Sequence, residues 1–177
     1  MLDLCGLSVP SAPAPYTSVL VLNVGALRGS RYPADHWVYV PRSASGFHRV
    51  GFYSNVAEHF VPASRRGRAS AACLYVERSF VGGERPSGAD VDRYAAQVVR
   101  ELQAWGFIAE VDVVDPTWVD VAYTWSHPGS AWTSEATAAL AGHGIRVAGR
   151  YARWSFQGIA DSLRDGYLAG LALRAGA

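Results

Sequence analysis

The sequence contains few of the residues from which common binding and catalytic motifs are built. It has two cysteines, Cys5 and Cys73, and neither belongs to a CxxC pair, which excludes the usual zinc and disulfide-exchange motifs. Its five histidines are scattered and show no HExxH spacing, so we expect no metal site. There is no GxSxG elbow, catalytic Cys-His signature or Walker motif, which argues against hydrolytic and nucleotide-hydrolysing chemistry.

The sequence also lacks a large excess of positive or negative charge, and it lacks long apolar runs. The 16 basic residues are all arginine, and with 15 acidic residues they give a formal net charge of +1, which argues against a nucleic-acid-binding protein. No run reaches the ~18 apolar residues that a membrane-spanning helix requires. Residues 1–15 lack the basic and apolar segments of a signal peptide. We therefore expect a cytoplasmic protein that binds neither nucleic acid nor membrane.

Half of the 177 residues are hydrophobic, and their pattern predicts an α+β fold. Helical periodicity predicts helices from about residue 90 to 105, over 133–144 and over 158–174. Thr133 or Ser134 would cap the second of these helices. Runs rich in β-branched residues predict strands at 16–26, 36–40, 47–54, 71–79, 107–115, 118–125 and 145–150, with Pro116 separating two of them.

These elements predict a mostly antiparallel sheet of about five to seven strands, with helices on one face and a long C-terminal helix. Residues 1–15, which end in SAPAP, read as a flexible N-terminal tail. Residues 16–177 would then form a single α+β domain.

The segment GIRVAGRYARWSFQGIADSLRDG, residues 144–166, has the pattern of a ligand-binding strand, turn and helix. Backbone amides at 158–160 would lie at the positive end of the helix dipole. Gly166 and Gly170 would leave a flat helix face that another backbone can approach. Three aromatic residues could lie against a planar ligand: Tyr151, Trp154 and Phe156. The alternative is a C-terminal helix whose glycines merely pack against the sheet.

VAGRYARWSFQGIADSLRDG resembles the C-terminal flavin-binding segment of FAD-dependent amine oxidase-like proteins, the group with protoporphyrinogen oxidase-like and UDP-galactopyranose mutase-like enzymes. HWVYVP, FHRVGFYSNV, ACLYVERS and VDPTWVDVAYTWSHPGS resemble the substrate-domain strands of the same proteins. The likeness covers roughly residues 16–175 in the family's order. It implies that the chain corresponds to a substrate domain together with the C-terminal strand and helix that contact FAD.

The resemblance implies roles for particular residues of this chain. The cofactor-binding positions would be Gly149, Arg150, Trp154, Gln157, Gly158 and Ile159. The substrate-binding positions would be Trp37, Tyr53 and Trp125. Arg49, Tyr123 and His48 would be catalytic, with Arg49 or His48 polarising a carbonyl or carboxylate of the substrate. The alternative for each aromatic residue is that it fills the core between the sheet and a helix.

The chain departs from the family in one large respect. Family members begin with a strand–GxGxxG–helix unit that holds the ADP half of FAD. Here Gly25 and Gly29 lack a third glycine in register, and the glycines at 82, 83 and 88 have the wrong spacing. We therefore expect FAD to bind only with a partner domain, and otherwise no cofactor.

Three functions are compatible with this sequence. The chain could be half of a split FAD-dependent oxidoreductase that acts on a small organic substrate in bacterial specialised metabolism, such as antibiotic biosynthesis. It could be a stand-alone non-redox cyclase or isomerase that uses no flavin, or an accessory binding protein without catalysis. All three predict an apolar surface where the missing domain would pack, and hence either a homodimer or a complex with a flavin-domain chain.

Overall fold

The structure, a computed structural model, describes residues 1–68 and 70–175. Its contacts divide the chain into two compact units. Thr17–Val121 forms the first, which we call the sheet unit, and Met1–Tyr16 joins the segment from Ala122 onward in the second, the helical unit. The flexible tail over 1–15 and the single domain over 16–177 that the sequence suggests stay predictions.

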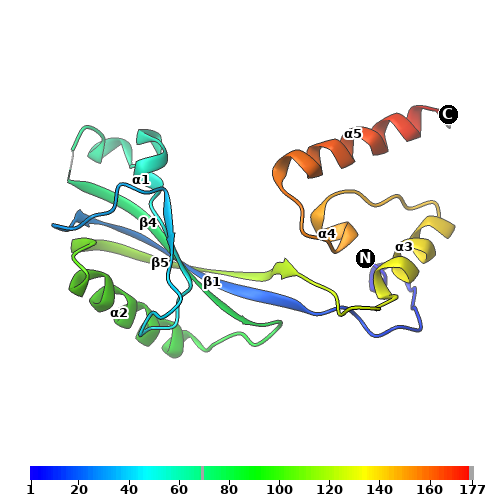
Figure 1. The fold of residues 1–177 in the computed structure, drawn as a ribbon, viewed down its shortest axis with the longest axis horizontal. Helices are drawn as coiled ribbons and strands as arrows, with labels where there is room; N and C mark the ends of the chain where they lie inside the picture. The colour runs from blue at the N-terminus through cyan, green and yellow to red at the C-terminus, as the bar shows by residue number, and fades with distance from the viewer. Residues whose placement is uncertain (69, 176–177) are drawn as a thin grey trace. The chain divides into compact units, whose positions relative to one another are not determined.

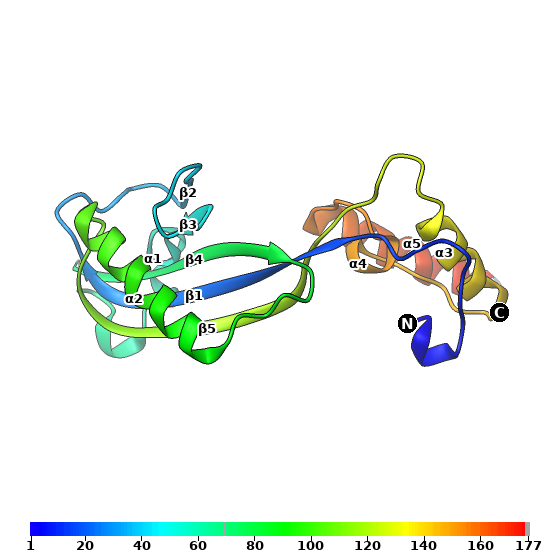
Figure 2. The same cartoon turned by 90° about the horizontal axis from the view of Figure 1, so that it is seen from below.

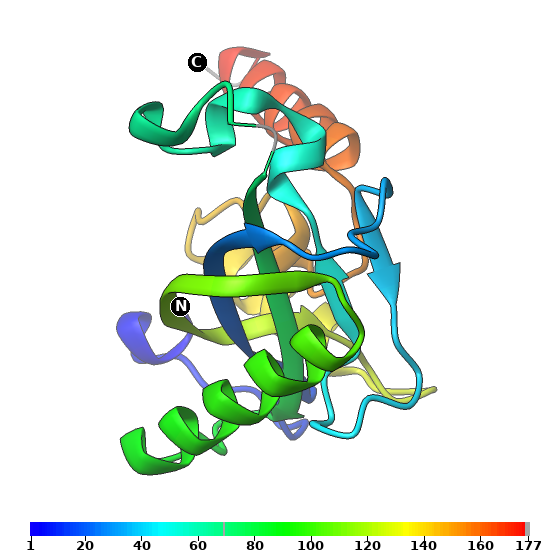
Figure 3. The same cartoon turned by 90° about the vertical axis from the view of Figure 1, so that its left-hand side faces the viewer.

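The sheet has five strands in the order β2-β3-β4-β1-β5 (Figure 1). They are β1 (Tyr16–Arg28), β2 (Trp37–Tyr39), β3 (Arg49–Gly51), β4 (Ala71–Val81) and β5 (Ile108–Thr124). Neighbouring strands run antiparallel, as the β1–β4, β2–β3 and β3–β4 registers show. The long strands β1, β4 and β5 lie side by side, and β2 with β3 forms the hairpin at one edge (Figure 2, Figure 3). The predicted α+β fold with an antiparallel sheet is confirmed.

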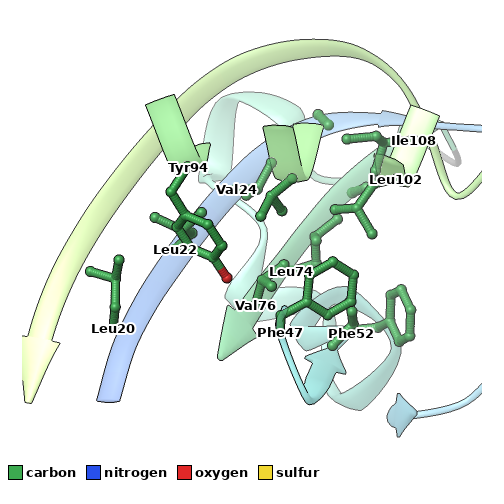
Figure 4. Close-up of a cluster of buried hydrophobic side chains, with 14 residues drawn as sticks. Leu20, Leu22, Val24, Phe47, Phe52, Leu74, Val76, Tyr94, Leu102 and Ile108 are labelled. Carbon is green, nitrogen blue, oxygen red and sulfur yellow. The ribbon is translucent and has the colours of Figure 1, made fainter. Parts of the chain in front are cut away.

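Helix α2 (Gly88–Ala104) covers one face of this sheet. Ser87 caps it by accepting the Asp90 amide at 3.2 Å. The buried stripe Tyr94, Val98 and Leu102 recurs at the spacing of a single helix face. These side chains meet the inward residues of the central strands, including Leu20, Leu22, Val24, Leu74 and Val76 (Figure 4). Burial of each such side chain contributes ~1.5–3 kcal/mol, so this interface is the core of the unit.

Short elements between β3 and β4 lie on the other side of the sheet. They are α1 (Tyr53–Val56) and two 3₁₀ turns, η2 (Glu58–Phe60) and η3 (Ala63–Arg65). Arg65 ties η3 to β5 through an ion pair with Asp112 at 2.8 Å. These elements cover one end of the face that α2 leaves exposed.

The helical unit contains η1 (Asp3–Cys5), α3 (Trp132–Gly142), α4 (Arg150–Arg153) and α5 (Ile159–Ala175). The backbone amide of Ser11 donates to Glu135 of α3 at 3.0 Å. The Trp154 indole N–H is shared between the carbonyls of Pro15, at 3.3 Å, and Trp125, at 3.2 Å. These bonds fasten the N-terminal segment to this unit. None of the described helices has the length and apolar character needed to cross a membrane.

Three local predictions are wrong. The two strands expected on either side of Pro116 form one continuous strand, β5, which is possible because β5 is an edge strand where a proline can lack its ladder bond. Residues 145–150 form no strand, since Gly149 adopts a left-handed φ of 83° and α4 begins directly after it. Helix α3 starts after Ala131 without a side-chain cap, and Ser134 instead donates back to the Ala131 carbonyl.

Candidate functional site

The alternation of β4 places two polar residues on the sheet face opposite α2. Leu74 and Val76 point into the core, so Tyr75 and Glu77 point to the other face. In the β3–β4 register Gly51 lies opposite Tyr75, and Arg49 lies opposite Glu77. Residues directly opposite in antiparallel strands share a face. The β2–β3 register adds Trp37 and Tyr39 to it. We call this surface the aromatic face: Trp37, Tyr39, Arg49, Gly51, Tyr75 and Glu77.

An ion pair lies at the centre of the aromatic face. The Arg49 guanidinium donates through Nη2 to Glu77 Oε1, and the two side chains are 23% and 11% exposed. The His48 Nε2 atom lies 3.6 Å from the other Glu77 oxygen. Arg49 therefore does not face solvent as an isolated anion partner, because a nearly buried carboxylate already holds it in position.

Aromatic rings surround this ion pair. The Arg49 guanidinium carbon lies 5.7 Å from the Tyr75 ring centroid and 6.0 Å from that of Tyr39. Tyr53, from α1, lies 4.7 Å from Tyr75 between centroids and stacks on Phe60 at 5.4 Å. The combination of a fixed guanidinium and several ring faces can hold a planar or cyclic ligand that carries a carbonyl or carboxylate group.

The protonation states at this face follow from burial. Burial raises the pKa of Tyr53 and of Tyr75, so both phenols keep their protons at neutral pH and can donate. Burial also lowers the pKa of His48, although the Glu77 carboxylate acts in the opposite direction. The imidazole is therefore neutral at neutral pH and can accept a proton. Together these groups provide hydrogen-bond donors, an arginine–glutamate ion pair and a base.

Gly51 is required for this arrangement. A Cβ atom at Gly51 would lie 2.0 Å from the Tyr75 ring, so Gly51→Ala must push that ring away from Arg49 and Tyr53. We expect a loss of ~1–3 kcal/mol in unfolding free energy and a change in the near-ultraviolet circular dichroism of the tyrosines. Gly88→Ala is the matched control because its Cβ would meet open space, and it should be neutral or stabilising by ~0.4–1 kcal/mol. Equal stability of the two variants, with unchanged tyrosine spectra, would contradict this packing.

In the helical unit the Asp165 side chain is the central acceptor. It accepts the Gly149 amide at 3.3 Å and the Gln157 side-chain amide at 3.0 Å, and it pairs with Arg153 Nε at 2.7 Å. The hydrogen bond from Gln157 is the main reason that the pKa of Asp165 is lowered. The carboxylate thus joins the turn before α4, the loop after it and α5.

Arg150 is the residue of this unit whose contacts most suggest a ligand. Its guanidinium carbon lies 5.5 Å from the Tyr123 ring and 4.9 Å from the Phe156 ring. The Nε and Nη2 atoms are buried without a hydrogen-bond partner, and so is Oε1 of Gln157. Leaving a buried donor unsatisfied costs ~1–3 kcal/mol, so an acceptor from outside the described residues would stabilise this region.

Two other residues expected at the cofactor, Trp154 and Gly158, already have structural contacts. Trp154 packs its ring against Trp132 at 5.2 Å and Tyr16 at 6.4 Å between centroids, and its indole N–H binds two carbonyls. The Gly158 amide donates to the Asp161 carboxylate at 3.0 Å, as a capping bond. Ile159 is 83% exposed at the start of α5. Their cofactor-binding roles stay predictions.

Helix α5 exposes an apolar stripe on one face. Ile159, Leu163, Tyr167 and Leu171 follow each other at four-residue intervals, and they are 83%, 70%, 67% and 43% exposed. An added Cβ at Gly166 or at Gly170 would meet no atom within 4 Å, so the helix is also open at these positions. Exposed apolar surface of this extent is typical of an interaction surface.

The predicted site residues are divided between the two units. His48, Arg49 and Tyr53 come together in the sheet unit, with Trp37 on the same face. Tyr123 and Trp125 belong to the helical unit, where Tyr123 contacts Arg150. Sequence reasoning missed Tyr75 and Glu77, although the alternation of ACLYVERS carried the signal that these two side chains share a face.

Comparison with known proteins gives a fold and no family. No family model and no curated protein matches the sequence. Among solved structures, the chain is similar to that of reduced UDP-galactopyranose mutase, with a TM-score of 0.61 and 18% sequence identity. The match covers 78% of this chain and 29% of the mutase chain. The chain therefore has the fold of part of that enzyme and spans less than a third of its length.

Proposed function

We propose that this chain is the substrate-binding and ring-contacting part of a flavoenzyme-like protein. In this proposal a partner polypeptide with a strand–GxGxxG–helix unit completes an FAD site. The observation that carries the proposal is the exposed apolar stripe of α5, because a helix with Ile159 and Leu163 in water gains stability when another domain covers it. The fold match to 29% of the mutase chain supports it, since most of that chain has no counterpart in these residues.

The residues of the helical unit fit the uncharged part of FAD better than its diphosphate. The unsatisfied Nε and Nη2 atoms of Arg150 can donate to the carbonyl oxygens of the flavin ring, and Oε1 of Gln157 can accept from a ring N–H. Asp161 and Asp165 place negative charge near the start of α5, which disfavours a phosphate there. When bound, FAD would supply electron transfer with the substrate.

On the substrate side, the aromatic face would bind a small organic molecule. Tyr39 and Tyr75 offer ring faces to a cyclic substrate, and Arg49, which is paired with Glu77, lies beside these rings as a hydrogen-bonding group for the substrate's carbonyl or carboxylate. Neutral His48 can take a proton, and the Tyr53 phenol can donate one. A role in bacterial specialised metabolism stays a prediction from the resemblance.

Co-expression tests this function. The chain is produced with each polypeptide of the same genome that carries a strand–GxGxxG–helix unit and lacks a C-terminal part of its own. We expect one of these pairs to purify as a yellow complex with one FAD for each copy of this chain. Colourless, unassociated chain in every pairing would contradict the proposal, as would a homodimer in which the α5 stripes cover each other.

A second candidate is a non-redox isomerase or cyclase. The observation that favours it is the neutral His48 beside Glu77, with the protonated Tyr53 and Tyr75 nearby, because these groups can move a proton without a flavin. A colourless protein that converts a substrate, and that loses this activity in His48→Gln while staying folded, would favour this candidate over the first.

A further inference from the structure

Arginine side chains gather around a cavity in the sheet unit, away from the aromatic face. The cavity has a volume of about 310 Å³, and its lining includes residues of α1, Arg28 at the end of β1 and residues in and after η3. Four arginines and one glutamate are among the residues that line it: Arg28, Arg65, Arg66, Arg68 and Glu58. The lining is therefore strongly positive, although the whole chain is nearly neutral.

Two of these guanidinium groups are held in place by uncharged groups. Arg66 donates through Nε to the Val61 carbonyl at 3.0 Å and through Nη2 to the His59 carbonyl at 3.2 Å. Arg28 donates through Nε to the Ala71 carbonyl at 3.1 Å, and its guanidinium carbon lies 4.6 Å from the Tyr32 ring. These contacts fix the direction of both side chains before any ligand binds.

The fixed charges of Arg28 and Arg66 are not neutralised locally. Within residues 1–68 and 70–175, no carboxylate forms an ion pair with either one. Arg65 differs, because Asp112 pairs with it at 2.8 Å. The Glu58 carboxylate accepts the Gly67 amide at 3.1 Å, which holds the backbone between Arg66 and Arg68. The cavity thus combines ordered donors with uncompensated positive charge.

We propose that this cavity binds the phosphate or diphosphate group of a small-molecule ligand. A guanidinium offers a planar pair of N–H donors that matches phosphate oxygens, and charge-assisted bonds of this kind are about twice as strong as neutral ones. The volume is near the lower end of the ~300–1,000 Å³ typical of ligand pockets, which suits a compact anion. A concave site of this size also favours a small ligand over a nucleic-acid backbone, which binds extended basic surfaces.

Calorimetric titration of the full chain with inorganic pyrophosphate at low salt tests the proposal. We expect saturable binding at one site for each chain. Arg28→Gln and Arg66→Gln should each weaken this binding about tenfold, since each removes a charge-assisted hydrogen bond. Arg66→Lys keeps the charge and should have a smaller effect. Arg100→Gln, an exposed position on α2, is the matched control and should change the affinity less than twofold. Far-ultraviolet circular dichroism identifies any variant that does not fold.

Three results would overturn the proposal. The first is the absence of saturable pyrophosphate binding. The second is an equal loss of affinity in Arg100→Gln and Arg28→Gln, which would indicate general charge attraction. The third is a single-stranded oligonucleotide that binds more tightly than pyrophosphate at the same salt concentration. Because the titration involves no flavin and no partner chain, its outcome is independent of the function proposed above.

Discussion

If the proposed flavin-domain partner covers α5, replacing Leu163 with aspartate is expected to weaken its binding by about a hundredfold while the isolated chain stays folded. Leu163 is 70% exposed in the middle of the α5 stripe, so a charge there costs the free chain little. In the complex the carboxylate would be buried against apolar surface, and losses at the centre of an interface reach ~2–4 kcal/mol. A hundredfold weaker affinity corresponds to about 2.8 kcal/mol.

The control for this substitution is Val81→Asp. Val81 is 68% exposed, but it ends β4 in the sheet unit and lies outside the α5 stripe. Its aspartate variant should bind the partner as the wild type does. Calorimetry or biolayer interferometry measures the affinity of each variant for the partner. If Leu163→Asp and Val81→Asp bind equally well, the α5 stripe is not the surface that the partner covers.

Glu77→Ala is expected to produce the largest loss of stability at the aromatic face. The Glu77 carboxylate is 11% exposed and faces the Arg49 guanidinium, which is 23% exposed. Removing one partner of a buried pair costs ~3–5 kcal/mol in general, and the partial exposure of Arg49 reduces the expected loss here to about 2–3 kcal/mol. Urea unfolding of the full chain measures the loss as a lower midpoint.

Two further variants serve as comparisons for the stability loss of Glu77→Ala. Glu77→Gln keeps the side-chain volume and one oxygen acceptor, so it should lose less than Glu77→Ala. Asp112→Ala breaks the pair with Arg65, whose side chains are 35% and 32% exposed, and it should cost no more than ~1 kcal/mol. If Asp112→Ala and Glu77→Ala destabilise the protein equally, Glu77 does not serve to hold Arg49.

The sheet unit could be predicted well because its signals are local. The apolar stripe of α2 recurs at Tyr94, Val98 and Leu102, which is the spacing of a helix. The run of β-branched residues in β1 favours a strand over a helix. The continuity of β5 through Pro116 could not be predicted, because a proline is tolerated only at an edge and the strand order is a long-range property.

The candidate site was only partly predictable for the same reason. Adjacent residues such as His48 and Arg49 could be assigned together, but their shared partner Glu77 is 28 residues further from Arg49 along the chain. The bonds that Asp165 accepts from Gly149 and Gln157 likewise span 16 and 8 residues. Composition and periodicity carry no information about which distant side chains meet, so these contacts emerge only from the fold.

In the proposed function this chain provides only one side of a flavin site. Titration of FAD into the purified chain, followed by flavin fluorescence, measures whether it does. We expect a dissociation constant above ~10 µM for the chain alone, since the ~8 kcal/mol required for micromolar binding exceeds what Arg150 and Gln157 can supply. With the proposed partner present, we expect submicromolar binding. Submicromolar binding of FAD to the chain alone, or no FAD binding by the complex, would contradict the proposed function.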